Sequence, residues 1–199
     1  MTTPTPEQRA GRRHLLLVAL LFFAPLAFAA WIYFGSGWRP GGSVQHGELV
    51  EPPRPLPLTP LLMPDGGVIA SDALRGSWFL VHLVEGECDD RCLDALAESR
   101  RLRLALGRNM SRVTRVLLHS GGCCSTDVQA GPGRDLLVLG APGPEGAALR
   151  NLFPPAPGGG AGLYIVDPRG SLILSYPATG RSRGLLEDLE RLLRLSNIG

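Results

Sequence analysis

The sequence predicts an α/β domain that follows a single membrane-spanning helix. Three patterns support this fold class: an uncharged apolar run near the N-terminus, short apolar runs that alternate with a charged helical segment, and a leucine stripe at helical spacing near the C-terminus. The 199 residues are enough for one domain and an appendage. The formal net charge is only +2, so we expect no nucleic-acid partner.

The apolar run at residues 15–34 contains no charged side chain and is expected to be a transmembrane helix. About 20 helical residues, each rising about 1.5 Å, cross a bilayer core of about 30 Å. Arginines precede the run and the first charge after it is Arg39, so the positive-inside rule places residues 1–14 in the cytoplasm and the remainder across the membrane. The alternative is a signal peptide cleaved at Ala27-Phe28-Ala29, but the apolar run continues beyond that site to Phe34.

Residues 35–60 are expected to form a linker, because they are rich in glycine and proline. Such a density of proline favours an extended, polyproline-like chain over a helix or a central strand. The remaining residues, 61–199, have the size of a typical domain and are expected to fold as one.

Apolar periodicity predicts the first elements of this domain in chain order. Trp78–Val84 is a continuous apolar run, which is typical of a strand buried on both faces. Residues 90 to about 106 lack proline and glycine and are rich in leucine, alanine and arginine, which favours a helix. Two further strands are expected at Arg112–His119 and Asp135–Gly140.

The C-terminal part of the chain predicts a hairpin and a helix. Gly162–Tyr176 contains two apolar runs joined by Asp167-Pro168-Arg169-Gly170, whose residue types suit a type I turn. Gly184–Leu195 carries leucines at helical spacing on one side, and its charged residues, Asp188 among them, are expected on the other side. Strand, helix, strand, hairpin and final helix together indicate an α/β sandwich of the thioredoxin type.

The pair Cys88 and Cys92 directly follows the first of these strands and opens the helix. The partial positive charge at a helix N-terminus favours a thiolate there. Residues four apart in a helix lie on one face, close enough for a disulfide after a small adjustment or for joint binding of a soft ion such as Cu(I). We therefore expect a redox or metal site at these cysteines. The alternative, a purely structural disulfide, is disfavoured because so short a loop stabilises the fold little.

Acidic side chains surround this pair. They are Glu85, Glu87, Asp89, Asp90 and Asp94. Only Arg91 opposes them. Nearby carboxylates disfavour a further negative charge, so they should raise the pKa of both thiols. The acidic surroundings are also expected to attract a cation or a basic patch on a partner.

Three stretches of the chain resemble the SCO/SenC family. They are Leu74–Val81 (LRGSWFLV), Cys88–Cys92 (CDDRC) and Leu163–Gly170 (LYIVDPRG). Within that family, the chain looks most like the short SCO-like transmembrane proteins found with bacterial cytochrome oxidase genes. The resemblance implies a membrane-anchored protein of thioredoxin fold that delivers copper to the CuA centre of cytochrome c oxidase or reduces cysteines of that centre.

Under this resemblance, Cys88 and Cys92 correspond to the two thiol ligands with which the family holds copper. The family's third ligand is a histidine in the loop before the late hairpin, whereas residues 153–162 of this chain contain no histidine. Two thiolates alone would hold Cu(I) less selectively. Thiol–disulfide exchange does not depend on the missing histidine.

The resemblance thus implies an accessory factor for cytochrome c oxidase assembly in a bacterial inner membrane, with its C-terminal domain in the periplasm. Cys88, nearer the helix start, is expected to attack, and Cys92 to resolve the mixed disulfide. The implied partner is an oxidase subunit or another copper or thiol assembly factor. A general periplasmic thiol–disulfide oxidoreductase and a non-catalytic scaffold are the alternatives, and whether the protein is an enzyme stays open.

The other histidines and cysteines give further hypotheses. His119, Cys123 and Cys124 follow the second strand, and if the first two strands are parallel these residues lie at the same sheet edge as Cys88. One of them could then replace the missing ligand or form a second exchange partner, and the alternative is a loop with incidental thiols. His82 lies within the first strand and is expected to be a hydrogen-bonded core histidine.

Overall fold

The computed structural model describes residues 6–35, 45–121, 123, 128, 135–157 and 162–196. The chain divides into two compact units, residues 1–43 and 44–199. The first unit contains α1 (Pro6–Gly35). Its Arg13–Ile32 stretch is the one part of the described chain that is long and apolar enough to cross a membrane. Length and composition therefore make α1 a candidate membrane span at the place that the sequence predicts.

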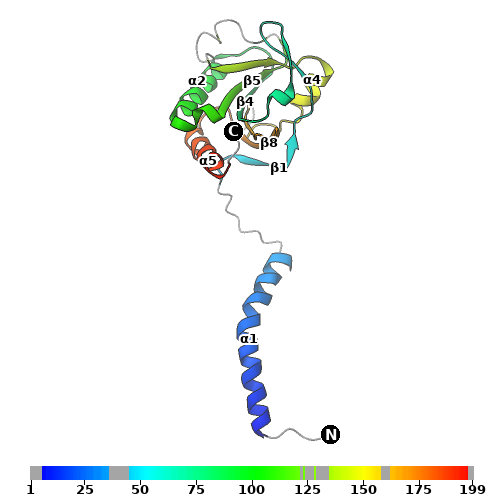
Figure 1. Ribbon diagram of the computed structural model, residues 1–199, viewed down its shortest axis with the longest axis vertical. Helices are drawn as coiled ribbons and strands as arrows, with labels where there is room; N and C mark the ends of the chain where they lie inside the picture. Colours follow the sequence, from blue (N-terminus) through cyan, green and yellow to red (C-terminus); the bar gives the residue numbers. More distant parts are fainter. Residues whose placement is uncertain are drawn as a thin grey trace. The chain divides into compact units, whose positions relative to one another are not determined.

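The second unit is a mixed α/β domain of thioredoxin type, with helices on both faces of one sheet (Figure 1). Its strands are β1 (Glu48–Pro55), β2 (Pro60–Leu62), β3 (Val68–Ala70), β4 (Trp78–Val84), β5 (Val113–His119), β6 (Leu136–Gly140), β7 (Gly162–Val166) and β8 (Ser171–Pro177). Its α-helices are α2 (Asp90–Ala105), α4 (Gly143–Arg150) and α5 (Ser182–Leu195). Two short 3-10 turns, η1 (Ser71–Ala73) and η2 (Gly107–Arg112), complete the elements.

The sheet has the strand order β1-β8-β7-β4-β5-β6-β2-β3 within the described residues. β4, β5 and β6 are parallel, and the β4–β5 register runs from Trp78 opposite Val113 to Val84 opposite His119. β7 pairs with β4, and β8 with β7, in antiparallel fashion. Because parallel strands end at the same edge, the segment after β4, which carries Cys88, and the segment after His119 leave the sheet together.

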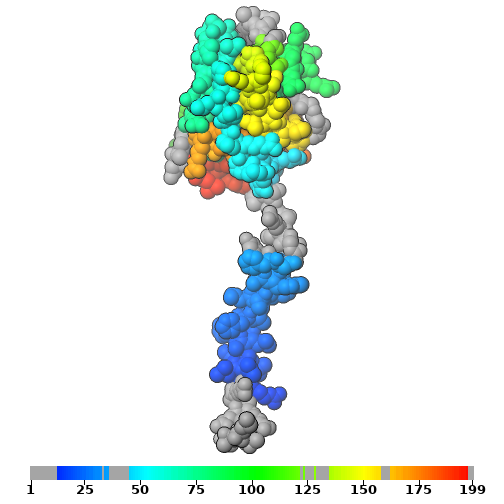
Figure 2. Space-filling model, turned by 90° about the vertical axis from the view of Figure 1, so that its right-hand side faces the viewer, coloured from blue at the N-terminus to red at the C-terminus, as the bar shows by residue number. Residues whose placement is uncertain are grey.

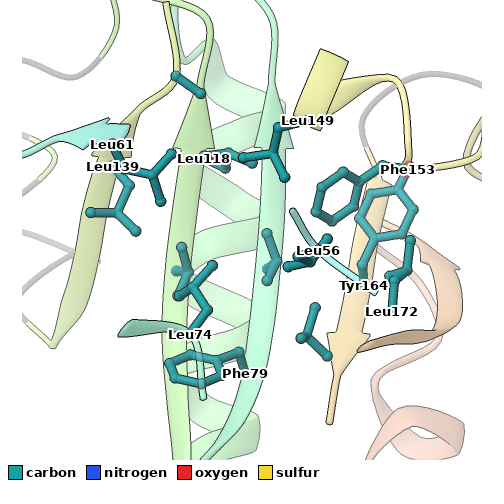
Figure 3. Packing of buried hydrophobic residues seen from close by; sticks show 14 of the residues in the cluster. Leu56, Leu61, Leu74, Phe79, Leu118, Leu139, Leu149, Phe153, Tyr164 and Leu172 are labelled. Atoms are coloured by element: carbon teal, nitrogen blue, oxygen red, sulfur yellow. The ribbon is translucent and has the colours of Figure 1, made fainter. Parts of the chain in front are cut away.

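Alternate residues of the central strands point to opposite faces of the sheet and fill separate parts of the core. On one face, Phe79 and Val81 pack with Leu149 of α4. Figure 3 shows Phe79 and Leu149 within this cluster. On the other face, Trp78 and Leu80 pack with leucines of α2 and α5. Each fully buried apolar side chain of this size stabilises the fold by about 1.5–3 kcal/mol.

The prediction of a linker over residues 35–60 is wrong for the second half of that range. Glu48–Pro55 is β1, which pairs with β8 at the edge of the sheet. Proline lacks an N–H group, so it is excluded from central strands but fits an edge strand whose outer side forms no ladder. Polyproline-like and β conformations are both extended, so local composition cannot separate them. The pairing with β8, which is distant in sequence, decides between them.

The sequence also does not predict β2, β3 and α4. In Figure 2 the cyan segment that contains β1 lies against the yellow segment around α4. Arg54 of β1 donates a hydrogen bond from Nη1 to the carbonyl oxygen of Leu152 at 2.7 Å, which joins these two segments. Helix α4 begins within a Pro- and Gly-rich stretch, with Pro142 as its N-cap residue, and this composition conceals a helix of only eight residues.

A buried carboxylate fastens the chain before β1 onto the last helix. Asp188 of α5 is only 2% exposed, so the expectation that it lies on the polar face is wrong. Its Oδ2 accepts hydrogen bonds from the N–H groups of His46 (2.6 Å) and Gly47 (3.2 Å) and from the hydroxyl of Tyr176 (2.6 Å). Burial alone would raise the pKa of Asp188, but these hydrogen bonds outweigh it and hold the pKa below its usual value. We call this group of four residues the Asp188 clasp.

Candidate redox site

Cys88 and Cys92 form a disulfide at the start of α2, with their Cα atoms 5.2 Å apart. Asp89 is the N-cap residue of this helix, and its Oδ1 accepts a hydrogen bond from the Cys92 N–H group at 2.9 Å. Cys88 therefore precedes the helix, which corrects the expectation that both cysteines share a helical face. The N–H group of Cys92, a potential donor to a thiolate, is already bound to a carboxylate.

The two cysteines differ in accessibility. Cys92 is 6% exposed, whereas Cys88 is only half-buried. The apolar cluster against which they pack includes Val84, Leu96 and Leu117. A partner's sulfur can thus reach Cys88 more easily than Cys92, which the protein shields on its inner side.

An open cleft of about 730 Å³ lies beside the disulfide. Cys92 lines it together with Glu85, Glu87 and Asp89, the acidic residues of the loop between β4 and α2. All three acidic residues are exposed. The cleft therefore joins a disulfide to a strongly acidic surface.

The rest of the lining is mainly apolar and is held in place by β7. It includes residues 153–156, with the sequence Phe-Pro-Pro-Ala. The Tyr164 hydroxyl donates a hydrogen bond to the carbonyl oxygen of Pro154 at 2.6 Å. The rings of Phe153 and Tyr164 pack edge to face with their centroids 5.0 Å apart. Figure 3 shows these two side chains next to each other. A Cβ added at Gly162 would collide with the Tyr164 side chain, so glycine is needed there to keep this wall in position.

A buried polar network holds α2 against the central strands. Arg115 of β5 is fully buried and donates hydrogen bonds to the carbonyl oxygen of Leu96 (2.6 Å), to Ser99 Oγ (3.1 Å) and to Asp135 Oδ1 (2.6 Å). His82 Nε2 lies 2.8 Å from the same Ser99 Oγ. Burial and, secondarily, the charge of Arg115 lower the pKa of His82 to about 3, so this histidine is neutral at physiological pH. The expectation of a hydrogen-bonded core histidine is confirmed, whereas the burial of Arg115 was not predicted.

Comparison with known proteins bears directly on this site. Residues 78–196 match the model of a family described as "Transmembrane-like, thioredoxin-like, C-terminal domain". The chain belongs to this family. The matched region begins at β4 and ends one residue beyond α5, so it contains both cysteines of the site. None of the curated proteins matches the chain.

This protein has the fold of Sco proteins. Yeast Sco1 is 13% identical, with a TM-score of 0.60 over 74% of this chain and 98% of Sco1. Copper-bound ScoI of Bradyrhizobium japonicum is 18% identical, with a TM-score of 0.53 over 69% of this chain and 98% of ScoI. BsSco, described as a member of the Sco family of cytochrome c oxidase assembly proteins with a disulfide switch, is 12% identical, with a TM-score of 0.54 over 73% of this chain and 96% of BsSco. Identities this low establish the fold alone.

The donors beside the disulfide do not make up a Cu(I) site with three ligands. Among the described residues, no group of three or more histidine, cysteine, aspartate or glutamate side chains is arranged to hold a metal. The segment 153–157, where the SCO/SenC resemblance implies a ligand, contains only phenylalanine, proline and alanine. The carboxylates of the cleft are hard oxygen donors, whereas Cu(I) prefers thiolates. The lining suits thiol exchange better than a three-ligand copper site.

The hypothesis about His119, Cys123 and Cys124 is answered in part. Cys123 packs against the same apolar cluster as the site disulfide and is itself disulfide-bonded, and Cys124 lies outside the described residues. The ring of His119 lies against Gly140, and its Nδ1 is buried without a hydrogen-bond partner in the described chain. Burial lowers the pKa of His119, which favours the neutral form of its ring. The shared sheet edge is therefore confirmed for Cys123, but it offers no free thiol there.

Proposed function

We propose that this protein is a membrane-anchored thiol–disulfide exchange factor for cytochrome c oxidase assembly, acting through Cys88 and Cys92. One observation carries the proposal: the disulfide lies at the start of α2 beside an open cleft, and it links residues only four positions apart. Such a short cross-link constrains the unfolded chain little, so stability alone does not account for it. The resemblance to the SCO/SenC family and the Sco-like fold support oxidase assembly as the setting.

The exchange proceeds in two balanced steps. In the reduced protein the half-buried Cys88 attacks, as a thiolate, one sulfur of a disulfide in the partner. A mixed disulfide forms, and the first partner thiolate leaves and takes up a proton. The Cys92 thiolate then attacks the Cys88 sulfur, which closes the Cys88–Cys92 disulfide and releases the second partner thiolate. Two electrons pass from the cysteine pair to the partner's disulfide, and two protons end on the partner's thiols.

The electrostatic surroundings support this direction of electron flow. Three cleft carboxylates disfavour thiolates nearby, and Asp89 occupies the N–H group of Cys92. Destabilising the reduced thiolate form lowers the reduction potential, because a stabilised reduced form is what makes an oxidoreductase strongly oxidising. The pair is therefore suited to reduce a partner's disulfide, as a copper centre with cysteine ligands requires before it is loaded.

Transient handling of Cu(I) is the second candidate, with copper as cargo. The observation in its favour is the 5.2 Å separation of the two Cα atoms, which brings two thiols together in the reduced protein. Thiolates are the ligand type that Cu(I) prefers. With two protein donors, the ion would be held weakly enough to pass on.

The proposed location follows from the charges that flank α1. Residues 1–14 stay in the cytoplasm, α1 crosses a bacterial inner membrane, and the domain lies in the periplasm. In this arrangement the thioredoxin-like domain includes β1. The periplasm is an oxidising compartment in which a disulfide persists until a specific reductant reaches it. The proposed partner is an oxidase subunit or another copper or thiol assembly factor.

The test measures disulfide reduction by the full-length protein in detergent. A Cys123→Ser/Cys124→Ser background removes the other two cysteines, so that only the site pair reacts. The reduced protein is mixed with the oxidised CuA domain of cytochrome c oxidase, and the thiols that appear on that domain are counted by mass. A Cys92→Ser variant should trap the mixed disulfide, and Cys88→Ser should abolish reduction. In parallel, Cu(I) is titrated against a competing chelator.

The outcomes separate the proposed functions. Reduction of the CuA domain and trapping at Cys88 support the exchange function. Reduction of a small disulfide such as DTNB with no effect on the CuA domain would instead indicate a general oxidoreductase. Failure with both substrates would leave a scaffold role. One tight equivalent of Cu(I), lost in Cys88→Ser/Cys92→Ser, would favour copper delivery.

A further inference from the structure

We infer that Glu85, Glu87 and Asp89 make the exchange site selective for polypeptide segments that carry positive charge beside the reacting cysteine. The inference rests on the proposed exchange function and specifies its substrate class. It assigns a role in recognition to three side chains that neither form the disulfide nor contribute to the core.

The three carboxylates are placed to act on a bound segment. They line the same cleft as Cys92, and all three are exposed. None of them forms an ion pair with a cation in the described chain, where the ion pairs lie elsewhere. Asp89 binds the Cys92 N–H group, which fixes its carboxylate next to the disulfide without neutralising it. Their negative potential is thus available to a ligand.

The remainder of the lining strengthens this potential. Arg150 is the one cation among the described lining residues, and its Nη1 donates a hydrogen bond to the carbonyl oxygen of Ala141, which does not line the cleft. The apolar residues 153–156 form a surface of low dielectric constant, which focuses the field of nearby charges. Carboxylates outnumber guanidinium groups three to one, so the cleft attracts cations.

The size and chemistry of the cleft indicate a short polypeptide stretch as the ligand. A cleft of about 730 Å³ is within the range of sites that bind ligands of several hundred daltons, about 300–1,000 Å³. Pro154 and Pro155 offer an apolar surface without N–H donors, against which an aliphatic side chain can pack. A segment that combines apolar residues with arginine or lysine near its cysteine therefore matches the lining.

The experiment compares synthetic peptides of equal length that carry one cysteine flanked by arginines, by glutamates or by serines. The full-length oxidised protein carries Cys123→Ser/Cys124→Ser, so that only the site disulfide reacts. Each peptide thiolate attacks this disulfide to give a mixed disulfide, and a second peptide thiolate releases the peptide disulfide and the reduced protein. Each rate is divided by the rate of the same peptide with bis(2-hydroxyethyl) disulfide, an uncharged disulfide, which removes differences in intrinsic thiol reactivity. We expect the normalised rate of the arginine peptide to exceed that of the glutamate peptide about tenfold in about 10 mM salt. In about 1 M salt, where the Debye length falls to about 3 Å, this ratio should be about twofold or less.

Matched variants test whether the cleft residues cause the preference. Glu85→Gln, Glu87→Gln and Asp89→Asn together should reduce the ratio to about twofold or less, and asparagine at the N-cap position keeps the start of α2 intact. The control is Asp90→Asn, Asp94→Asn and Glu98→Gln, which changes the net charge equally at residues that do not line this cleft. The control should retain the tenfold ratio.

The results distinguish this inference from the function on which it rests. Exchange at equal normalised rates for all peptides overturns the charge selection but leaves the exchange function standing. An equal loss of preference in the control variant also overturns it, because net charge alone would then explain the effect. If no peptide reacts faster with the protein than with its Cys88→Ser/Cys92→Ser variant, the proposed function itself fails and the inference fails with it.

Discussion

The Asp188 clasp gives a prediction whose size follows from its contacts. Asp188→Ala removes a buried carboxylate that accepts hydrogen bonds from His46, Gly47 and Tyr176. Hydrogen bonds to charged groups contribute about 1.5–3 kcal/mol each, and a buried donor left without a partner costs about 1–3 kcal/mol. The two N–H groups lie near the surface and can regain water, whereas the Tyr176 hydroxyl cannot. We therefore expect a loss of about 3–5 kcal/mol in the free energy of unfolding.

Milder changes at the same place should cost less. Asp188→Asn keeps one acceptor oxygen and should cost about 1–2 kcal/mol, and Tyr176→Phe removes one hydroxyl and should cost about 1 kcal/mol. Arg183→Ala is the control on the same helix. It breaks only the exposed ion pair with Glu187 and should cost no more than about 0.5 kcal/mol.

The assay is urea unfolding of a fragment that contains residues 44–199, the second compact unit. Trp78 is the only tryptophan in this fragment and packs with the leucines of α5, so its fluorescence reports on the clasped helix. With a urea dependence of about 2 kcal/mol per molar, a loss of 4 kcal/mol lowers the midpoint by about 2 M. A loss below about 1 kcal/mol for Asp188→Ala would refute the clasp as a stabilising element.

The pH dependence of the clasp has a definite sign. Because the pKa of Asp188 is held below its usual value in the folded protein, its contribution is present above the unfolded pKa of about 3.9. The contribution is lost as the pH falls through the folded pKa. The stability difference between wild type and Asp188→Asn should therefore be largest near neutral pH and shrink below about pH 4.

Three further predictions concern other parts of the domain. His82 takes up a proton near pH 6.5 when the protein is unfolded but only near pH 3 when it is folded. The wild type should therefore lose free energy of unfolding as the pH falls between these values, by up to about 1.4 kcal/mol per pH unit. His82→Gln should show a shallower pH dependence in urea unfolding at pH 4–7. Gly146→Ala should lower the free energy of unfolding by more than about 2 kcal/mol in the same assay at pH 7, because the added Cβ would collide with the backbone of Ala141 and push α4 off the sheet. The control on the same helix, Ala148→Gly, should lower it by only about 1 kcal/mol. Asp89→Asn keeps the N-cap and removes an exposed charge next to the site cysteines. Such a charge interacts with a thiolate by about 1 kcal/mol, so the reduction potential should rise by roughly 20 mV in glutathione buffers. An unchanged or lower potential would contradict the electrostatic argument.

The sequence predicts those parts of the fold that depend on local apolar patterning. The strand Trp78–Val84 has the predicted bounds, since an uninterrupted apolar run of this length has few alternatives inside a domain. The turn Asp167–Gly170 also forms as predicted, because Asp167 Oδ1 accepts a hydrogen bond from the Ser171 N–H group at 2.7 Å, and Gly170 adopts a positive φ of 83°. These residues determine their conformation largely by themselves.

Features that depend on distant partners were not predictable. Arg115 and Asp188 are charged residues in a strand and a helix, and charged side chains usually face solvent. The partners that stabilise the buried Arg115 include the carbonyl oxygen of Leu96 and the carboxylate of Asp135, and neither is near it in sequence. The acidic surroundings of the cysteines were visible in the sequence. That these acidic residues share one cleft with residues 153–156 was not predictable, because it depends on the pairing of β4 with β7.

The prolines of β1 bear on how many copies of this protein can share a membrane. Without β1, strand β8 would end the sheet with a row of open N–H and C=O groups, which is a template for pairing with another chain. β1 covers that row, and its own Pro52, Pro53 and Pro55 lack the N–H groups that a further strand would need. Anchored domains meet one another at high local concentration, where an open sheet edge would drive aggregation. A soluble fragment cut at residue 61 would expose β8 and should associate, whereas one that keeps β1 should stay dispersed.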